Sequence, residues 1–450
     1  MKKPHRQIVR AISLSAILIA AVILCVVRWN VWFGNPPEQP YTPQQQPHNI
    51  TLTYGEQANS QRIISWRADT LQHNPTLLLI NPTGEEYSYS PTDTLICSRA
   101  GKAVFYRVRL TDLTAGEYRY SIVQNDSATD WYSFEVTPLK ETIFALFGDV
   151  QNELGGSSEM IFHNVDSLFP QTDFWAFAGD IIERPTDAYW QYWYGTMKNI
   201  PLCKPIIAAT GNHEYLKGII KTIDPRWTSI FGNPDNGPDM AKEKSYYIDF
   251  PDMRFIVIDT DGLYLLSHYT KTSAWLRRVS QNNGKKWNIL MLHHPIYSAG
   301  AGRENIILNF ALRNSVKNID LVIQGHDHSY ARRFSRRDSV PVTPTFVVTT
   351  TADKFYLPKV SRKDDRIMSG HAVYNIARTV GDTLDFNTFV AETNELYDRF
   401  LIVKTVDNTM LHDLAPDTPE IIDLPEKYKD KKGTKIIRFY NHRQTRLNER

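Results

Sequence analysis

The chain has 450 residues, of which 42% are hydrophobic, so it can bury at least one large core and is not a disordered protein. Its 51 lysines and arginines stand against 49 acidic residues, and this balance excludes the charge excess of a dedicated nucleic-acid binder. We therefore expect no nucleic-acid partner, and any anionic substrate must be attracted by a local group of charges.

The chain begins with an apolar run from about Ile8 to Val27, which nearly reaches the roughly 20 residues that span a bilayer. By the positive-inside rule, the basic residues around its start stay cytoplasmic: Lys2, Lys3, Arg6 and Arg10. No small-x-small site follows the run and Trp29 resembles an interfacial anchor, so an uncleaved helix is favoured over a cleaved signal peptide. We predict a cytoplasmic stub and transmembrane signal anchor over residues 1–28, with the remainder extracytoplasmic, at the periplasmic face of an inner membrane.

Two regions of different composition follow the predicted anchor. Residues 29–47 are rich in proline and glutamine, which predicts an extended linker or tether. Residues 48–138 contain short runs of alternating apolar residues, for example 62–66 and 105–110, separated by turn-rich stretches. This spacing predicts a small β-sandwich.

Continuous apolar runs then predict strands that are buried on both faces, at 143–147, 174–178, 206–208, 255–258, 289–292 and 321–323. Helix-length segments lie between several of them, so residues 139–426 are predicted to form a layered α/β domain with its reactive groups at strand ends. The basic segment 427–450 has no clear hydrophobic pattern. We expect a solvated, partly disordered tail there, with contact to anionic lipid or polymer as the alternative.

Metal-capable residues follow five of the six predicted strands at once. The motifs are Gly148-Asp149-Val150-Gln151, Gly179-Asp180, Gly211-Asn212-His213-Glu214, His293-His294-Pro295 and Gly325-His326-Asp327-His328. One aspartate after a strand is commonplace, because aspartate favours turns, but five such motifs in order are not. Two cations held by such ligands about 3.5 to 4 Å apart stabilise the attacking and leaving oxygens of a phosphoryl displacement. They also lower the pKa of bound water, which supplies the nucleophile.

This ordered set of motifs resembles the calcineurin-like metallophosphoesterase superfamily, and the preceding sandwich resembles the fibronectin type III-like domain of purple acid phosphatases. The resemblance covers residues 51–406. It implies a four-layer αββα domain, of mixed α+β and α/β class, preceded by a small all-β sandwich and an N-terminal transmembrane helix. It also implies two divalent or trivalent metal ions, from among Mn, Zn, Fe and Mg, and a small-molecule phosphoester substrate.

The resemblance also assigns roles residue by residue. The first metal would be held by Asp149, Asp180 and His328, and the second by the bridging Asp180 with Asn212, His293 and His326. His213 would lie beside the phosphate and either stabilise it or protonate the leaving oxygen, a task suited to imidazole.

Two positions depart from the pattern of the family. Glu183 stands where purple acid phosphatases have a ligand tyrosine, so no purple tyrosinate-Fe(III) site is expected. Gln151 stands where many superfamily members have a histidine, and its amide oxygen would be a weaker ligand that favours Mn²⁺, Mg²⁺ or loosely held Zn²⁺. An Asp-x-Gln motif also resembles that of manganese-dependent diphosphatases in the same superfamily.

Two further residues stay open at the level of sequence. His294 is next to a ligand, but alternation points it away from His293, so packing and catalysis are equally good interpretations. Arg303 lies in the loop after the His-x-Pro motif, where it would serve either as a phosphate clamp or as a solvated charge.

The leading functional hypothesis is hydrolysis of a phosphomonoester, with a metal-bound hydroxide attacking phosphorus in line. The first alternative is an Mn-dependent phosphodiesterase or diphosphatase, and the loops at 153–158, 183–189 and 299–304 would decide between them by admitting a second substituent. The second alternative is an envelope interaction module with an inactive metal domain. Intact ligand positions argue against it, because a decayed site loses ligands.

Overall fold

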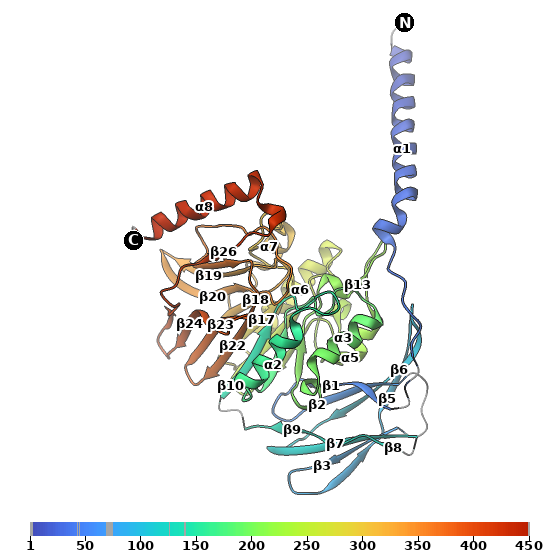
Figure 1. The fold of residues 1–450 in the computed structure, drawn as a ribbon, viewed down its shortest axis with the longest axis vertical. Helices are drawn as coiled ribbons and strands as arrows, with labels where there is room; N and C mark the ends of the chain where they lie inside the picture. Colours follow the sequence, from blue (N-terminus) through green and yellow to red (C-terminus); the bar gives the residue numbers. More distant parts are fainter. Residues whose placement is uncertain are drawn as a thin grey trace.

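The computed structural model describes residues 3–42, 44, 46–68, 75–125, 127–138 and 141–448 (Figure 1). It begins with the helix α1 (Lys3–Phe33), which rises alone from one end of the molecule (Figure 1). Among the described residues, Ile12–Phe33 is the one stretch long and apolar enough to cross a membrane. The predicted apolar helix is therefore present and continues past residue 28 to Phe33, while the predicted flanking charge Lys2 lies outside the described residues.

The next region is a β-sandwich of two antiparallel sheets. One sheet has the order β1 (His48–Tyr54), β2 (Arg62–Ala68), β6 (Gly101–Leu110) and β5 (Thr92–Ser98). The other has the order β4 (Glu86–Tyr89), β3 (Thr76–Ile80), β7 (Gly116–Gln124) and β8 (Ser127–Ala128), with β9 (Tyr132–Val136) paired to β7. Alternate residues of both sheets, such as Trp66 and Tyr120, point inward and form one core between them.

The region after the sandwich, called here the two-sheet region, is built on two larger sheets. The first has the order β12 (Ile206–Ala208), β11 (Phe174–Phe177), β10 (Glu141–Phe147), β22 (Val373–Val380), β23 (Thr383–Val390), β24 (Leu396–Lys404) and β25 (Thr409–Asp413). The second has the order β15 (Tyr246–Asp249), β16 (Met253–Ile258), β17 (Trp287–Leu292), β18 (Leu321–Gln324), β20 (Val340–Val348), β19 (Tyr330–Arg337), β21 (Arg366–Ser369) and β26 (Ile421–Ile422). All six apolar runs predicted to be buried strands are strands of these two sheets.

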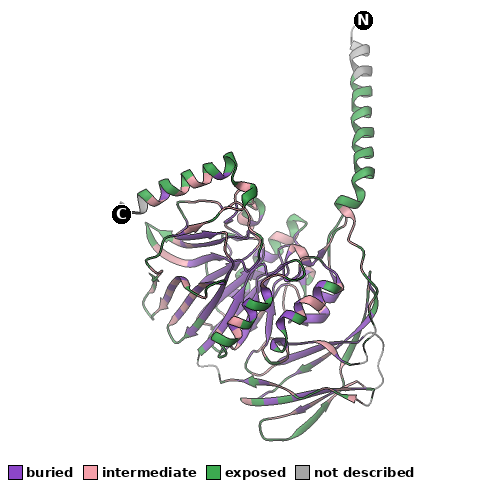
Figure 2. Ribbon diagram, viewed as in Figure 1, coloured by how far each residue is buried: buried purple, intermediate pink, exposed green. Residues whose placement is uncertain are grey.

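Helices cover the outer face of each sheet, and the strands between them are buried (Figure 2). Side chains of α2 (Ser158–Leu168), α3 (Asp187–Met197) and α5 (Pro225–Phe231) pack on the first sheet, next to the short α4 (Ile200–Cys203). Those of α6 (Leu266–Ser280) and α7 (Ile306–Leu312) pack on the second. A third apolar core, with Phe144 and Met291, lies between the two sheets. The predicted four-layer αββα fold is confirmed.

The sandwich is fixed to the two-sheet region by polar contacts. Ser65 donates to the backbone oxygen of Ile230, and Tyr120 donates to that of Leu202 at 2.8 Å. Arg107 lies 2.7 Å from the carboxylate of Glu243. The two regions therefore form a continuous body.

The proline-rich segment after α1 is extended but is not a free tether. The carboxylate of Glu38 is buried, with Arg226 of the two-sheet region at 2.7 Å and Arg99 of the sandwich at 2.8 Å. The backbone nitrogen of Tyr41 donates to Ala100 at 2.9 Å. One buried glutamate thus ties the predicted linker to both regions.

The basic C-terminal segment forms an 18-residue helix, α8 (Lys431–Asn448), which corrects the expectation of a partly disordered tail. Arg443 is buried, pairs with the carboxylate of Glu420 and donates to the backbone oxygen of Asp364 at 2.8 Å. One face of α8 is thus held on the second sheet, and its opposite face is exposed (Figure 2).

Candidate metal centre

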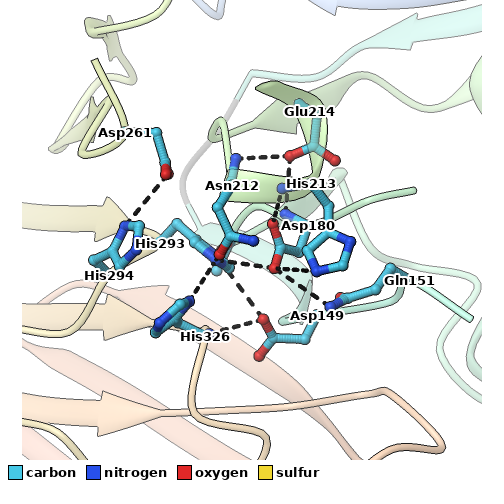
Figure 3. A network of polar contacts seen from close by, with 12 residues as sticks. Asp149, Gln151, Asp180, Asn212, His213, Glu214, Asp261, His293, His294 and His326 are labelled. Atoms are coloured by element: carbon cyan, nitrogen blue, oxygen red, sulfur yellow. Dashed lines mark hydrogen bonds and ion pairs between the residues drawn. The ribbon is translucent and has the colours of Figure 1, made fainter. Parts of the chain in front are cut away.

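The predicted ligands meet at the carboxyl ends of strands from both sheets. Asp149 follows β10 and Asp180 follows β11 in the first sheet, whereas His293 follows β17 and His326 follows β18 in the second. Figure 3 shows these side chains and Asn212 converging on one point. The polar groups are brought together because parallel strands present their carboxyl ends at one edge.

The ligand atoms fall into two overlapping groups. Those of Asp149, Asp180 and His328 lie within 4.8 Å of one another, and so do those of Asp180, His293 and His326. In the second group, His293 Nε2 lies 3.1 Å from Asp180 Oδ2 and 3.2 Å from His326 Nδ1. Asn212 Oδ1 lies 3.3 Å from the same His293 nitrogen. Asp180 is common to both groups, which is the division of ligands that the resemblance implies.

Gln151 lies in the first group. Its side-chain nitrogen is 3.3 Å from Asp180 Oδ2 and 3.1 Å from His328 Nε2. Gln151 Oε1 and Asp149 Oδ2 are buried and have no hydrogen-bond partner among the described residues. Buried polar atoms nearly always find a partner, so two such oxygens fit a site for cations.

Four of the predicted ligands have a strained, left-handed backbone conformation. Asp149, Asp180, His326 and His328 all have positive φ, at 50°, 51°, 74° and 47°. This left-handed conformation costs about 1 to 3 kcal/mol per residue and is found where a local arrangement is enforced for function. Gly211 is required beside them, because a Cβ there would lie 2.2 Å from the backbone nitrogen of Asp180.

Backbone carbonyl groups orient two of the imidazole rings. His293 Nδ1 lies 2.9 Å from the oxygen of Ala178, and His328 Nδ1 lies 2.5 Å from that of Lys354. Donation at Nδ1 leaves the Nε2 lone pair of each ring facing the carboxylates. Such a contact fixes the tautomer and the direction of a metal-binding histidine.

Burial and neighbouring charges shift the pKa values of the predicted ligands, some upward and others downward. Burial raises the pKa of Asp149 to about 8 and lowers the pKa of His328 to about 3. Burial also opposes protonation of His293, but the charge of Asp180 outweighs it and raises the pKa of that ring to about 10. Ligands bind metals in the deprotonated form, so metal loading must displace the proton of His293.

His213 lies outside both ligand groups, at the edge of the centre. Its Nδ1 is 2.5 Å from the backbone oxygen of Glu183, and its Nε2 is 3.9 Å from Asp180 Oδ2. Burial opposes its charge, but Asp180 and Glu183 outweigh burial and raise the pKa of His213. Glu183, at the position of the family's tyrosine, is absent from both groups.

Arg303 reaches the centre but is already engaged there. Its guanidinium lies 3.1 Å from Asp327 Oδ1, and its Nη2 lies 2.8 Å from both the backbone oxygen and the Nε2 of His326. It therefore holds His326 with Nδ1 toward the ligand group. Its role as a phosphate clamp stays a prediction.

Sequence reasoning gave no role to two acidic residues that build the site. Glu214 accepts hydrogen bonds from the backbone nitrogens of Gly211, Asp180, Ile181 and Ile182, at 2.7 to 3.2 Å. Asp327 accepts from Ser298, Ala299 and Gly300 at 2.7 to 3.0 Å. Both stand inside the recognised motifs, within two residues of predicted ligands, and this closeness in sequence was the available signal.

His294 turns away from the ligand groups. Its Nδ1 lies 3.3 Å from Asp261 Oδ2 and 3.2 Å from the hydroxyl of Thr260 (Figure 3). Its ring centroid is 4.2 Å from that of His326. His294 thus packs behind a predicted ligand, outside the two groups.

A match to a known protein family indicates the class of domain to which this geometry corresponds. Residues 143–330 match the calcineurin-like phosphoesterase family, so the chain contains a calcineurin-like phosphoesterase domain. The two-sheet fold, with metal-capable groups at its strand ends, agrees with this match.

Relatives in sequence are distant. An uncharacterized protein of Mycobacterium tuberculosis, Rv2577, is 22% identical over 342 residues, which cover 65% of this chain and 63% of the relative. Purple acid phosphatase 15 of Arabidopsis thaliana is 26% identical over 172 residues, which cover 35% of this chain and 31% of the relative. The chain thus spans less than two thirds of these relatives.

Solved structures share the fold. A purple acid phosphatase from yellow lupin (Lupinus luteus) seeds superposes with a TM-score of 0.68 at 15% identity, covering 80% of this chain and 75% of that one. PhoD superposes with a TM-score of 0.60 at 12% identity, covering 91% of this chain and all of that one. The fold therefore extends beyond the catalytic domain to most of the chain.

Proposed function

We propose that this protein hydrolyses phosphoesters at a two-metal centre on the outer side of the membrane crossed by α1. The observation that carries the proposal is the pair of ligand groups joined by Asp180 within a calcineurin-like phosphoesterase domain. Asp149, Gln151, Asp180 and His328 would hold one ion. Asp180, Asn212, His293 and His326 would hold the other.

The proposal divides the chain into five parts. Residues 1–28 form the cytoplasmic stub and the anchor, and 29–47 link the anchor to the body. Residues 48–138 form the fibronectin type III-like sandwich, 139–426 form the catalytic domain, and 427–450 form the basic C-terminal segment. The single apolar helix at the N-terminus supports this arrangement.

In this mechanism the bound metals supply an activated water and neutralise charge that develops on the phosphoryl oxygens. His213 lies at the wall of the cavity, where its raised pKa suits it to donate a proton to the leaving oxygen. Glu214 fixes the two loops that carry Asp180 and Asn212, because it accepts backbone hydrogen bonds from both. Arg303 holds the orientation of His326.

A specific observation favours diesters or diphosphates as a second class of substrate. A cavity of about 930 Å³ extends outward from Asn212 and His213, and this is more room than one phosphoryl group needs. Arg184, Lys217 and Lys221 line it and would attract a second anionic or bulky substituent.

The proposal is tested with the full chain in detergent, loaded separately with Mn²⁺, Zn²⁺, Mg²⁺ or Fe. p-Nitrophenyl phosphate, bis-p-nitrophenyl phosphate and ADP-ribose report monoesterase, diesterase and diphosphatase activity, and Asp180→Asn is the control. Metal-dependent turnover that is lost in the variant supports the proposal. Folded, metal-loaded protein that cleaves none of the three would make the interaction module the better explanation.

A further inference from the structure

The cavity at the metal centre is shared with the end of the membrane helix. Asn212 and His213 form its inner wall, and Asn30 and Trp32 of α1 form part of its outer wall. The apolar stretch of α1 continues to Phe33, so Asn30 and Trp32 lie at the level of the lipid headgroups if α1 crosses a bilayer. The metal centre therefore opens toward the membrane surface.

A short hairpin next to this cavity is bound directly to the end of α1. It consists of β13 (Tyr215–Leu216) and β14 (Thr222–Ile223) and follows the ligand Asn212 in the chain. The side chain of Asn35 donates to the backbone oxygen of Lys217 at 2.9 Å and accepts from its backbone nitrogen at 2.8 Å. This pair of hydrogen bonds holds the hairpin where the membrane helix ends.

The tip of this hairpin is apolar and flanked by lysines. Ile219 is 79% exposed and Ile220 is 69% exposed, and Lys217 and Lys221 stand on either side. Two adjacent exposed isoleucines between cations match an interfacial element, which inserts apolar side chains while its charges contact headgroups.

Two more apolar segments emerge at the edge of the sheets that carries the ligands. Leu265 and Leu266, at the start of α6, follow β16 and are 59% and 75% exposed. Ile306 and Phe310 of α7 follow β17 and are 78% and 71% exposed. Because β16 and β17 are parallel, both segments lie at the edge where His293 lies. Figure 1 shows β13, α6 and α7 at the end of the domain from which α1 rises.

The helix α8 adds positive charge at the same end of the molecule (Figure 1). Its exposed face carries Lys431, Lys432, Lys435 and Arg438. None of these four forms a salt bridge with a described acidic residue. A basic helix face without acidic partners is attracted to anionic lipid headgroups.

We propose that these apolar and basic segments seat the catalytic domain on the bilayer that α1 crosses, and that its metal centre acts on a phosphate group carried by a membrane lipid. This inference rests on the proposed function, because it names the substrate class of the same site. The basic lining of the cavity receives the anionic headgroup, and the lipid tail remains in the bilayer beside α1. Since α1 already anchors the chain, the docking segments fix its orientation.

Docking is tested by fluorescence with the full chain in nanodiscs of phosphatidylcholine and phosphatidylglycerol. The three native cysteines are replaced by serine, and an environment-sensitive dye is attached at Ile220→Cys, Phe310→Cys or Val406→Cys. Val406 is the matched control, because it is fully exposed in the turn after β24, whose antiparallel course places that turn at the opposite edge of the sheet. Quenching by nitroxide lipids at the first two sites and not at the third supports docking. Equal quenching at all three sites, or none, overturns it.

The substrate class is tested in the same nanodiscs with phosphatidic acid as the membrane-borne phosphoester and p-nitrophenyl phosphate as the soluble one. Ile219→Ser with Ile220→Ser is expected to lower phosphate release from phosphatidic acid at least about tenfold, because the effective concentration of substrate at the site falls. The soluble ester should change less than about twofold, since both substitutions are on the surface. Cleavage of the soluble ester with none of the lipid overturns the substrate class alone. Cleavage of neither overturns the proposed function, and the substrate class with it.

Discussion

Two buried charged clusters of this protein differ in how completely their charges are satisfied. The linker cluster, made of Glu38, Arg99, Asp224 and Arg226, contains two carboxylates and two guanidinium groups. Arg226 alone donates to Glu38 at 2.7 Å, to Asp224 at 2.7 Å and to the backbone oxygen of Pro185 at 3.0 Å. Burial opposes the charge of Arg226, but Asp224 outweighs it and raises the pKa of the guanidinium.

The candidate metal centre is more deeply buried, and its charges are incompletely paired. Asp149 and Asp180 lie close together, and among the three predicted histidine ligands only His293 has a raised pKa. Asp149 Oδ2 has no hydrogen-bond partner among the described residues. In both clusters, burying the charged groups costs desolvation free energy. The contrast indicates that a cluster whose charges are all paired stabilises the fold, whereas a cluster with unpaired carboxylate oxygens is arranged to bind cations.

The largest expected effect is that of Asp180→Asn on activity. Asp180 belongs to both ligand groups, so its loss should weaken the binding of both ions. The transition state then loses several kcal/mol of charge stabilisation, which lowers turnover about 1000-fold or more. Turnover of p-nitrophenyl phosphate and metal content by mass spectrometry measure this. The metal-free variant must still be folded, which far-ultraviolet circular dichroism checks. Unchanged turnover and metal content in a folded variant would contradict the placement of Asp180 in both ligand groups.

The second prediction concerns the complete cluster. Arg226→Met leaves the carboxylate of Asp224 buried without a cationic partner and leaves Glu38 paired with Arg99 alone, which costs about 3 to 5 kcal/mol in the free energy of unfolding. Urea unfolding of the full chain in detergent measures the loss. Arg337→Met, at an exposed arginine, is the control and should stay within about 0.5 kcal/mol of the wild type. Folded Arg226→Met should keep its metal content, and a loss of metal at unchanged stability would refute the division of roles.

The third prediction separates His213 from the ligands. His213→Asn should lower kcat about 100-fold, the lower end of the range for general acid catalysis, with no change in bound metal. The control is His163→Asn on the exposed face of α2, which should leave kcat unchanged. If His213→Asn loses one metal ion per chain, His213 is a ligand and the proposed role is wrong.

The sequence predicted the parts of this molecule that depend on local pattern. Continuous apolar runs mark buried strands in any fold, and predicted ligands such as Asp149 stand directly after them. The linker cluster was missed because nothing near Glu38 in the chain indicates its partner Arg226, which lies 188 residues away. The helix α8 was missed because its buried face includes Arg443, whose burial depends on Glu420 from another element. Contacts that tertiary structure creates leave no periodic signal.

The smallest expected effect concerns a half-buried carboxyl without a cationic partner, Asp173. It accepts hydrogen bonds from the backbone of Ile143 at 2.7 Å and from the hydroxyl of Thr137 at 3.4 Å, and no cation lies within salt-bridge distance among the described residues. Burial raises its pKa to about 6. In the unfolded chain an aspartate has a pKa of about 3.9.

Between these two values the folded state binds more protons than the unfolded state, so the stability contributed by Asp173 is present below about pH 4 and is lost as the pH rises through about 6. Because the side chain is partly solvated, we expect a loss of about 1 to 2 kcal/mol rather than the full value of the shift. Asp173→Asn removes this titration, and urea midpoints between pH 4 and pH 7 should then fall less steeply than in the wild type. Asp252→Asn, at an exposed position, should keep the wild-type slope. If the slope in Asp173→Asn equals that of the wild type, a single carboxyl at this depth is as well solvated as one in the unfolded chain. Burial alone would then not perturb a carboxyl, and the unbalanced charge at the metal centre would result from the closeness of Asp149 and Asp180.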